Sequence, residues 1–246
     1  MFFHFNSFIY SLLFLIGLEV IAFSYGLIFY VAFLLFLLSL WGSKKIGGTW
    51  IHSIMPTIFT FSSVSFLYLI DPVYSKQVFI ILSFIMFYFA MLGAYRLKEY
   101  ERDQTARGLV IASAAATLFF FYTSFYGIYL NFLIPLWILM LSFLFVTGAV
   151  SYQCFRIIRK DNRMISWNYS VLLGMVMAEF AWVMNFWPFG YLTTGVIALI
   201  FYYVLWDLAQ SYFLDILSKK RVIANVALFS FLVTLVLMSS RWLPVI

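Results

Sequence analysis

Residues 5–45 read FNSFIYSLLFLIGLEVIAFSYGLIFYVAFLLFLLSLWGSKK, an apolar run that ends in the first two lysines of the chain. As one helix, Phe5–Trp41 would be about 55 Å long at about 1.5 Å per residue. The hydrocarbon core of a bilayer is only about 30 Å thick. We therefore expect the run to fold back at Ser24-Tyr25-Gly26 and to form a helical hairpin. One strongly tilted helix is the alternative.

The other apolar stretches span residues 48–70, 78–97, 108–155, 167–214 and 222–240. Two of them are again too long for one crossing. We expect them to turn at Phe125-Tyr126-Gly127 and at Trp187-Pro188-Phe189-Gly190, because Pro cannot continue a helix and Gly eases a turn. The sequence thus predicts an all-α polytopic transmembrane bundle of nine helices with short loops, or of eight if the first run does not bend. Residues 1–246 are expected to form a single transmembrane domain, in which aromatic–Gly pairs at three turns indicate repeated hairpins.

Thirteen of the fifteen Lys and Arg residues gather in four breaks between apolar stretches, and the breaks between these four carry almost no positive charge. The clusters are Lys44 and Lys45; Arg96, Lys98, Arg102 and Arg107; Arg156, Arg159, Lys160 and Arg163; and Lys219, Lys220 and Arg221. Cytoplasmic loops of membrane proteins collect Lys and Arg. The pattern therefore predicts that these loops are cytoplasmic and that the C-terminus lies outside. Anionic lipid headgroups are their expected counter-charge.

The composition points to the same environment. Hydrophobic residues make up 65% of the chain and charged residues 10%, against roughly 45–50% and about 25% in soluble domains. The lipid bilayer must therefore act as the solvent of this protein. The net charge of +6 would suggest a nucleic-acid partner in a soluble protein, but here the basic residues flank apolar spans and no nucleic acid is expected. Cys154 is the only cysteine, which excludes an internal disulfide and a Cys-based metal cluster.

Three acidic residues fall within the predicted spans: Glu19, Glu179 and Asp207. An ionisable group in a span costs about 2.5–3.5 kcal/mol on insertion scales and is a functional candidate for that reason. Glu19 and Glu179 each precede an expected outer turn by about two helical turns. We therefore place both in the outer half of the membrane, as candidate substrate-binding residues that are protonated or lie beside water or a bound cation.

A substrate-binding pocket is predicted around Glu179, Trp182 and Asn185. Trp182 follows Glu179 by three residues and shares its helix face, while Gly174 and Ala178 form a seam of small residues beside it. Asn185 lies just above, before the break at Trp187-Pro188. Three interpretations of the glutamates remain open: proton or cation sites of a transporter, acid/base groups of an intramembrane enzyme, or hydrogen-bond donors that hold helices together.

The third predicted helix carries a polar stripe. Its members recur at helical spacing and are Thr49, Ser53, Pro56, Thr57, Thr60 and Ser63. One interpretation is that Ser53, Thr57, Thr60 and Ser63 line a solute path. The other is helix packing, with hydroxyls bonded back to carbonyls around a kink at Pro56.

Asp207 is expected near the inner end of the eighth predicted helix, and two interpretations are open for it. It is an interfacial acid beside Lys219, Lys220 and Arg221, or it forms an inner polar pair with His52 of the third helix. A single His with a single Asp is a weak signal for metal binding or catalysis.

The chain lacks a Gly-rich phosphate loop and the motifs HExxH, DxxxD and GxSxG. ATP hydrolysis, zinc proteolysis and Mg-dependent prenyl transfer therefore have no support. No metal and no cofactor is expected, and the sequence favours a protein that is not an enzyme. The leading hypothesis is an integral membrane protein of transporter or small-solute/lipid-binding type. The alternatives are a non-catalytic membrane partner or scaffold subunit, which includes a homo-oligomer, and an intramembrane lipid-modifying enzyme.

The stretch EFAWVMNFWPFGYLTTG, residues 179–195, followed by Tyr202-Tyr203, resembles the signature of a family of uncharacterised multi-pass membrane proteins. That family is found mainly in candidate-phyla bacteria with reduced genomes. The resemblance covers the seventh and eighth predicted helices. It implies that Glu179, Trp182 and Pro188 are a shared feature and that the plasma (inner) membrane of a bacterium is the setting. It implies no activity.

Overall fold

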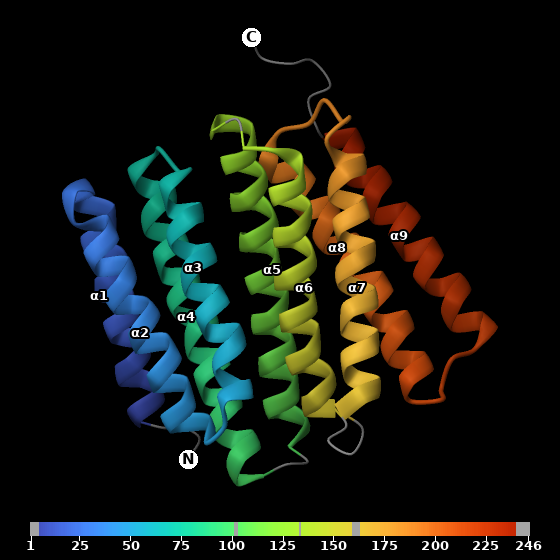
Figure 1. The fold of residues 1–246 in the computed structure, drawn as a ribbon, viewed down its shortest axis with the longest axis horizontal. Helices are drawn as coiled ribbons and strands as arrows, with labels where there is room; N and C mark the ends of the chain where they lie inside the picture. The colour runs from blue at the N-terminus through green and yellow to red at the C-terminus, as the bar shows by residue number, and fades with distance from the viewer. Residues whose placement is uncertain (1–4, 101–102, 133, 159–162, 240–246) are drawn as a thin grey trace. The chain divides into compact units, whose positions relative to one another are not determined.

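The computed structural model describes residues 5–100, 103–132, 134–158 and 163–239. These residues form nine α-helices and no strand, which confirms the predicted all-α class and the helix count. The chain divides into two compact units, unit 1 (Met1–Phe121) and unit 2 (Tyr122–Ile246), and helix α5 crosses from one to the other (Figure 1). The prediction of a single domain with repeated hairpins stays a prediction.

Unit 1 contains four helices and the first part of a fifth. They are α1 (Phe5–Phe23), α2 (Ile28–Gly47), α3 (Ile54–Tyr68), α4 (Val73–Glu99) and α5 (Gln104–Phe132), with short 3-10 turns η1 (Tyr25–Leu27) and η2 (Trp50–Ser53). The first apolar run is therefore two helices that pack against each other, and the eight-helix alternative is wrong. Its turn falls at the predicted Ser24-Tyr25-Gly26.

Two helix boundaries in unit 1 follow directly from residue type. Gly48 ends α2 in the left-handed region, with φ 75°, and its N–H donates to the carbonyl of Lys44 at 2.9 Å. Glycine adopts this conformation without the steric cost that other residues meet. Pro72, with extended backbone, directly precedes α4.

The centre of unit 1 is a column of aromatic rings. Phe14, Phe59 and Phe87 have no exposed surface. The rings of Phe14 and Phe87 stack with centroids 4.3 Å apart, and Phe59 lies 5.5 Å from Phe120 of α5. Offset ring pairs of this kind add about 0.5–1.5 kcal/mol each beyond their buried area, so the column fastens α1, α3, α4 and α5 together.

The start of α5 is held by one carboxylate. Asp103 accepts hydrogen bonds from the backbone N–H groups of Thr105 at 2.9 Å and Ala106 at 3.2 Å, and its other oxygen lies 2.6 Å from the guanidinium of Arg96. Desolvation alone would raise the pKa of Asp103. The Ala106 N–H, the charge of Arg96 and the Thr105 N–H outweigh it and lower this pKa below its ordinary value. Asp103 is thus a charged N-cap of α5.

Replacing Asp103 with alanine is expected to loosen the first turn of α5, because two backbone donors lose their acceptor. Hydrogen exchange at residues 105–108 should accelerate severalfold, while Asp103→Asn, which keeps an acceptor but not the charge, should have a smaller effect. The stabilisation is fully present above the ordinary Asp pKa of about 3.9. It is lost as the pH falls through the lowered pKa of the folded protein. Unchanged exchange in Asp103→Ala would contradict the assignment.

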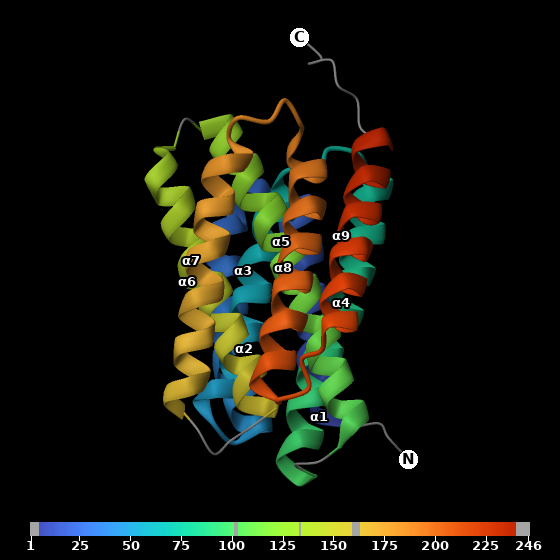
Figure 2. The ribbon, with the colours of Figure 1, turned by 90° about the vertical axis from the view of Figure 1, so that its right-hand side faces the viewer.

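Unit 2 contains the end of α5 and four further helices. They are α6 (Leu136–Ile158), α7 (Arg163–Met184), α8 (Tyr191–Phe213) and α9 (Lys219–Ser239). Helices α6 and α7 approach most closely at Gly174, where an added Cβ would lie 2.5 Å from the carbonyl oxygen of Leu144. At Gly174, the predicted seam of small residues thus lies against a neighbouring helix. Helix α9 packs against α8, and none of its residues is buried (Figure 2).

One predicted turn is wrong. Helix α5 continues through Tyr126 and Gly127 to Phe132, and the break comes at Pro135, directly before α6. A single Gly costs a helix only about 1 kcal/mol, whereas Pro lacks the N–H and disfavours a helical residue before it. Trp137 therefore lies in the first turn of α6. The change also removes one of the three turns on which the repeat hypothesis was based.

Seven of the nine helices are long and apolar enough to cross a membrane: α1, α2, α4, α5, α6, α8 and α9. Helix α3 has only 15 residues, because η2 takes up the start of the predicted span. Helix α7, with 22 residues, has the length but is less apolar than the seven.

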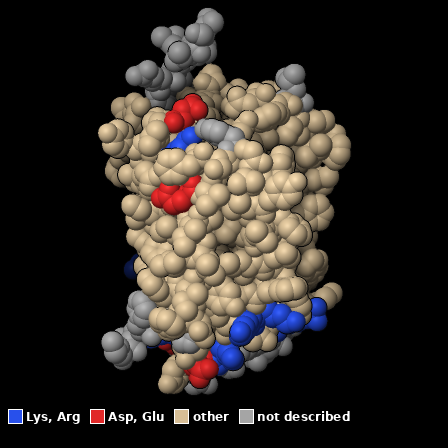
Figure 3. Space-filling view, turned by 90° about the vertical axis from the view of Figure 1, so that its left-hand side faces the viewer, with Lys and Arg blue, Asp and Glu red and all other residues tan. Residues whose placement is uncertain are grey.

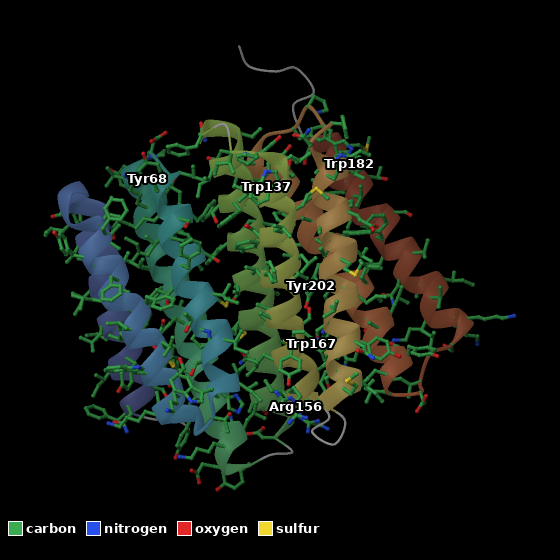
Figure 4. All side chains as sticks on the ribbon, viewed as in Figure 1. Tyr68, Trp137, Arg156, Trp167, Trp182 and Tyr202 are labelled. Carbon is green, nitrogen blue, oxygen red and sulfur yellow. The ribbon has the colours of Figure 1, made fainter. Side chains whose placement is uncertain are left out.

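Positive charge collects at helix ends. In unit 1, the last turn of α2 carries Lys44 and Lys45, and the last turn of α4 carries Arg96 and Lys98. Figure 3 shows most Lys and Arg of this face at one end of the helices, with its middle almost free of charge. In unit 2, Arg156 and Trp167 lie toward one end and Trp137 and Trp182 toward the other, with Tyr202 between them (Figure 4). Aromatic side chains at two levels are typical of a protein that meets two membrane interfaces.

Candidate functional site

The predicted polar stripe lies along η2 and α3 in unit 1. Ser53, Thr60 and Ser63 are at most 4% exposed. Thr60 donates to the carbonyl of Pro56 at 2.9 Å, as hydroxyls in membrane helices commonly do. The hydroxyls of Ser53, Thr57 and Ser63 are buried and have no hydrogen-bond partner among the residues that the structure describes. A buried polar group without a partner costs about 1–3 kcal/mol, so this hydroxyl row (Ser53, Thr57, Thr60 and Ser63) is poorly explained by packing alone.

Pro56 lies in the first turn of α3, because the helix begins only at Ile54. A proline in the first turn removes an N–H that has no partner within the helix. Pro56 is therefore compatible with a regular start of α3, and the hydroxyl row does not depend on a kink at this residue. Ser83 of α4, a helix that contacts α3, is likewise fully buried and without a hydrogen-bond partner in the described chain. A lone serine in an apolar stretch gives no periodic signal, so Ser83 could not be recognised as a candidate from the sequence.

Glu19 joins two helices of unit 1. Its carboxylate accepts a hydrogen bond from the side-chain amide of Gln77 at 3.1 Å, which links the end of α1 to the start of α4. Both side chains are half-buried. Gln77 was missed because the apolar pattern places the start of this span at residue 78, whereas α4 begins a turn earlier at Val73.

Glu179 and Trp182 share an outward face of α7 in unit 2. Both are exposed, Trp182 by 49%, and the Trp182 ring meets Phe186 edge-on at 5.3 Å. Asn185 is turned toward α5 instead, where its side-chain oxygen accepts a hydrogen bond from the hydroxyl of Tyr129 at 2.6 Å. One helical turn away along α5, Tyr126 donates to the carbonyl of Met184 at 3.0 Å. Tyr129 and Tyr126 therefore hold the end of α7, although the sequence pattern marks neither as a site residue and places Tyr126 in a turn.

In the predicted pocket, Glu179 and Trp182 thus point outward from α7, whereas the Asn185 amide is bonded to Tyr129 of α5. Glu19 lies in unit 1 and Glu179 in unit 2, so a common site for the two glutamates stays a prediction. The same holds for the inner polar pair, because His52 belongs to unit 1 and Asp207 to unit 2.

Asp207 is the most strongly bonded acid among the candidates. It accepts two hydrogen bonds from Arg221, at 2.8 and 3.2 Å, and one from the amide of Asn225 at 2.7 Å. Both partners lie on α9, so these bonds connect α9 to α8. The geometry agrees with the interpretation that Asp207 sits beside the basic cluster at the start of α9.

Two further hydroxyl pairs join helices inside unit 2. Tyr122 bonds to Thr147 at 2.8 Å and Tyr202 to Ser151 at 3.0 Å, and all four residues are buried. Paired hydroxyls of this kind satisfy each other and stabilise helix packing. Among the described residues, no group of three His, Cys, Asp or Glu side chains is placed to hold a metal ion.

Seven membrane-length apolar helices, ionisable groups within spans and basic residues at helix ends are the features of a multi-pass α-helical membrane protein. Residues 35–239 match the family described as "Protein of unknown function (DUF5656)". Since the match covers most of the chain, the protein belongs to this family, and membership of an uncharacterised family is confirmed. No curated protein and no solved structure matches the chain.

Proposed function

We propose that this protein binds a small solute or a lipid within the membrane in the manner of a transporter, and that protonation of a glutamate is coupled to binding. The observation that carries the proposal is the hydroxyl row of α3. Three of its four hydroxyls are buried without a partner in the described residues, in a protein whose surrounding solvent is hydrocarbon. A polar molecule moving along α3 would supply the missing hydrogen bonds.

Glu19 is the candidate glutamate that shares unit 1 with this row. It sits on α1 and its partner Gln77 on α4, and both of these helices contact α3. Ionisable residues inside membrane proteins typically mark ion or proton pathways. Protonation of Glu19 would remove its charge and weaken its bond to Gln77, which would change how α1 and α4 are held beside the row.

The membrane setting is part of the proposal. We place the four basic clusters in the cytoplasm, the C-terminus outside and both glutamates in the outer half of the membrane, because Lys and Arg accumulate on the cytoplasmic side. The plasma membrane of a candidate-phyla bacterium is the setting that the resemblance of residues 179–195 supports.

A second candidate function is a partner subunit, and the outward face of α7 favours it. The Glu179 carboxyl and the Trp182 ring are both exposed on that face. A carboxyl exposed to hydrocarbon is costly, and a helix of another membrane protein that covers it would relieve the cost.

Cysteine accessibility tests the path without knowledge of the solute. In a Cys154→Ala background, Thr57→Cys and Ser63→Cys are expected to react with a charged methanethiosulfonate reagent roughly ten times faster than Phe61→Cys, because a charged reagent is excluded from hydrocarbon. Phe61 lies on the same helix but is 52% exposed on its outer surface, where lipid would shield it. The protein is measured in proteoliposomes.

The outcomes separate the two functions. Labelling of any cysteine slows at low pH, because the thiolate is the reactive form. A decrease at low pH that exceeds this loss of thiolate, and whose excess disappears in Glu19→Gln, supports a path coupled to protonation. Unreactive cysteines at both row positions would contradict the path. In that case, a stoichiometric partner that co-purifies with the native protein and is lost in Glu179→Gln would support the subunit.

A further inference from the structure

A pocket of about 400 Å³ opens at the lysine-rich end of unit 1, between the start of α1 and the ends of α2 and α4. Its volume lies within the roughly 300–1,000 Å³ of ordinary ligand pockets. Its lining includes the polar residues Lys45, Lys98, Tyr10 and Asn6 and the apolar residues Ile9 and Leu13. We call the two lysines the cationic mouth of the pocket, and Ile9 and Leu13 its apolar wall.

Within the part of the chain that the structure describes, no acidic residue neutralises the positive charge of the mouth. Lys45 comes from the last turn of α2 and Lys98 from the last turn of α4. Neither lysine forms an ion pair with a described residue, and both are exposed. Two ammonium groups at one pocket attract an anion, and the Tyr10 hydroxyl and Asn6 amide offer further donors beside them.

Gly42 shapes this mouth. A Cβ at this position would lie 2.8 Å from the ring of Tyr10, so only glycine lets the ring rest against α2 at the edge of the pocket.

The surroundings of the pocket are typical of the level of lipid headgroups. The neighbouring Lys44 places its ammonium 3.8 Å from the centre of the Trp50 ring, and Trp41, one turn earlier on α2, is exposed. Indole rings prefer the membrane interface. From the apolar wall, Ile9, Leu13 and Ile16 continue along one exposed face of α1 at helical spacing, toward the bilayer interior.

We propose that this pocket binds one anionic phospholipid, with its phosphate between Lys45 and Lys98 and an acyl chain along Ile9, Leu13 and Ile16. The site shares no residue with the hydroxyl row of α3. A negative result in the cysteine-accessibility experiment therefore does not contradict the lipid site. A negative result in the lipid-binding experiment does not contradict the solute path.

The test uses the full chain, purified in a neutral detergent and examined by native mass spectrometry. It is titrated with phosphatidylglycerol, with phosphatidylcholine of the same acyl chains, and with inorganic phosphate. The variant K45Q/K98Q removes the two lysines of the mouth. The variant R163Q/K220Q is the matched control, because it removes two exposed positive charges from helix ends of unit 2.

One phosphatidylglycerol is expected to bind the native chain in preference to phosphatidylcholine. Each interfacial lysine contributes about a fivefold gain in affinity, so K45Q/K98Q should bind it about 25-fold more weakly, while R163Q/K220Q keeps the native affinity. Equal binding of the two lipids, or equal loss in both variants, would overturn the proposal. So would full displacement of the lipid by millimolar phosphate, which would indicate a site for a free anion. An unchanged thermal transition of K45Q/K98Q without lipid verifies that the variant is folded.

Discussion

Gly174→Ala is expected to destabilise the protein by about 3 kcal/mol, near the upper end of the usual range for overpacking. The new methyl group would lie 2.5 Å from the carbonyl oxygen of Leu144 and 3.4 Å from the backbone nitrogen of Gly148. A backbone carbonyl cannot rotate away as the end of a side chain can. Helices α6 and α7 must therefore separate along their whole contact, which is the most extensive helix pairing in the described chain.

Thermal unfolding in detergent measures this effect. A loss of about 3 kcal/mol should lower the apparent transition by roughly 6–12 °C in a chain of this size. Two matched glycine variants serve as controls. Gly148→Ala faces the same seam, but its nearest neighbour, the Ser170 carbonyl oxygen, would lie at an ordinary 3.5 Å. Gly108→Ala on α5 would meet nothing within 4 Å, so it should be neutral or slightly stabilising.

If all three variants unfold at the same temperature, the close approach of α6 and α7 is wrong. A decrease confined to Gly174→Ala would show that membrane helices associate here through backbone proximity, as small-residue seams allow.

The helix count could be predicted because bilayer thickness limits helix length. The run from Phe5 to Trp41 is too long to cross once, and Ser24-Tyr25-Gly26 is the one place in it where a turn is favourable. The same rule misplaced the turn of the next long run, since it treated Gly127 as a break. In the structure, Tyr126 bonds to Met184 and Tyr129 to Asn185, and these contacts hold the last two turns of α5 in a helix. Contacts between residues nearly sixty positions apart leave no trace in local periodicity.

In the candidate site, too, local features could be predicted from the sequence, whereas contacts between distant residues could not. Hydroxyls at helical spacing on α3 are visible in the sequence because periodicity is local. The partner of Glu19 is not, since Gln77 lies just outside the apolar stretch and is brought to Glu19 only by the packing of α4 on α1. The lipid pocket needs the ends of three helices together, so no single segment could indicate it.

Asp207→Ala is expected to release α9 from α8. Helix α9 has no buried residue, and its polar attachment consists of the bonds from Arg221 and Asn225 to this carboxylate. A ring contact between Phe201 and Phe229, with centroids 5.7 Å apart, adds an apolar link. The Asp207 side chain is 16% exposed and that of Arg221 38%. Asp207→Ala is therefore expected to weaken the association of α9 with α8 by about 2 kcal/mol. This value lies between the small contribution of a surface ion pair and the large cost of breaking a buried one.

Disulfide cross-linking between Phe201→Cys and Phe229→Cys, in a Cys154→Ala background, reports the attachment in the membrane. With Asp207 intact, the two cysteines should cross-link rapidly, and Asp207→Ala should slow the reaction about tenfold or more, since about 1.4 kcal/mol corresponds to a factor of ten. Asp215→Asn is the matched control. It removes one negative charge from the connection between α8 and α9, and Asn tolerates the positive φ of 56° found there.

The charge exchange Asp207→Arg with Arg221→Asp should restore much of the cross-linking, because it re-forms the pair with opposite polarity. His52→Ala distinguishes the two interpretations of Asp207: it should leave the cross-link unchanged if Arg221 is the functional partner and should slow it if the inner polar pair holds the helix. If Asp207→Ala cross-links as fast as the chain that keeps the carboxylate, apolar contacts other than the Phe201–Phe229 ring pair hold α9 in place together with lipid, and the Asp207 carboxylate serves some purpose other than anchoring.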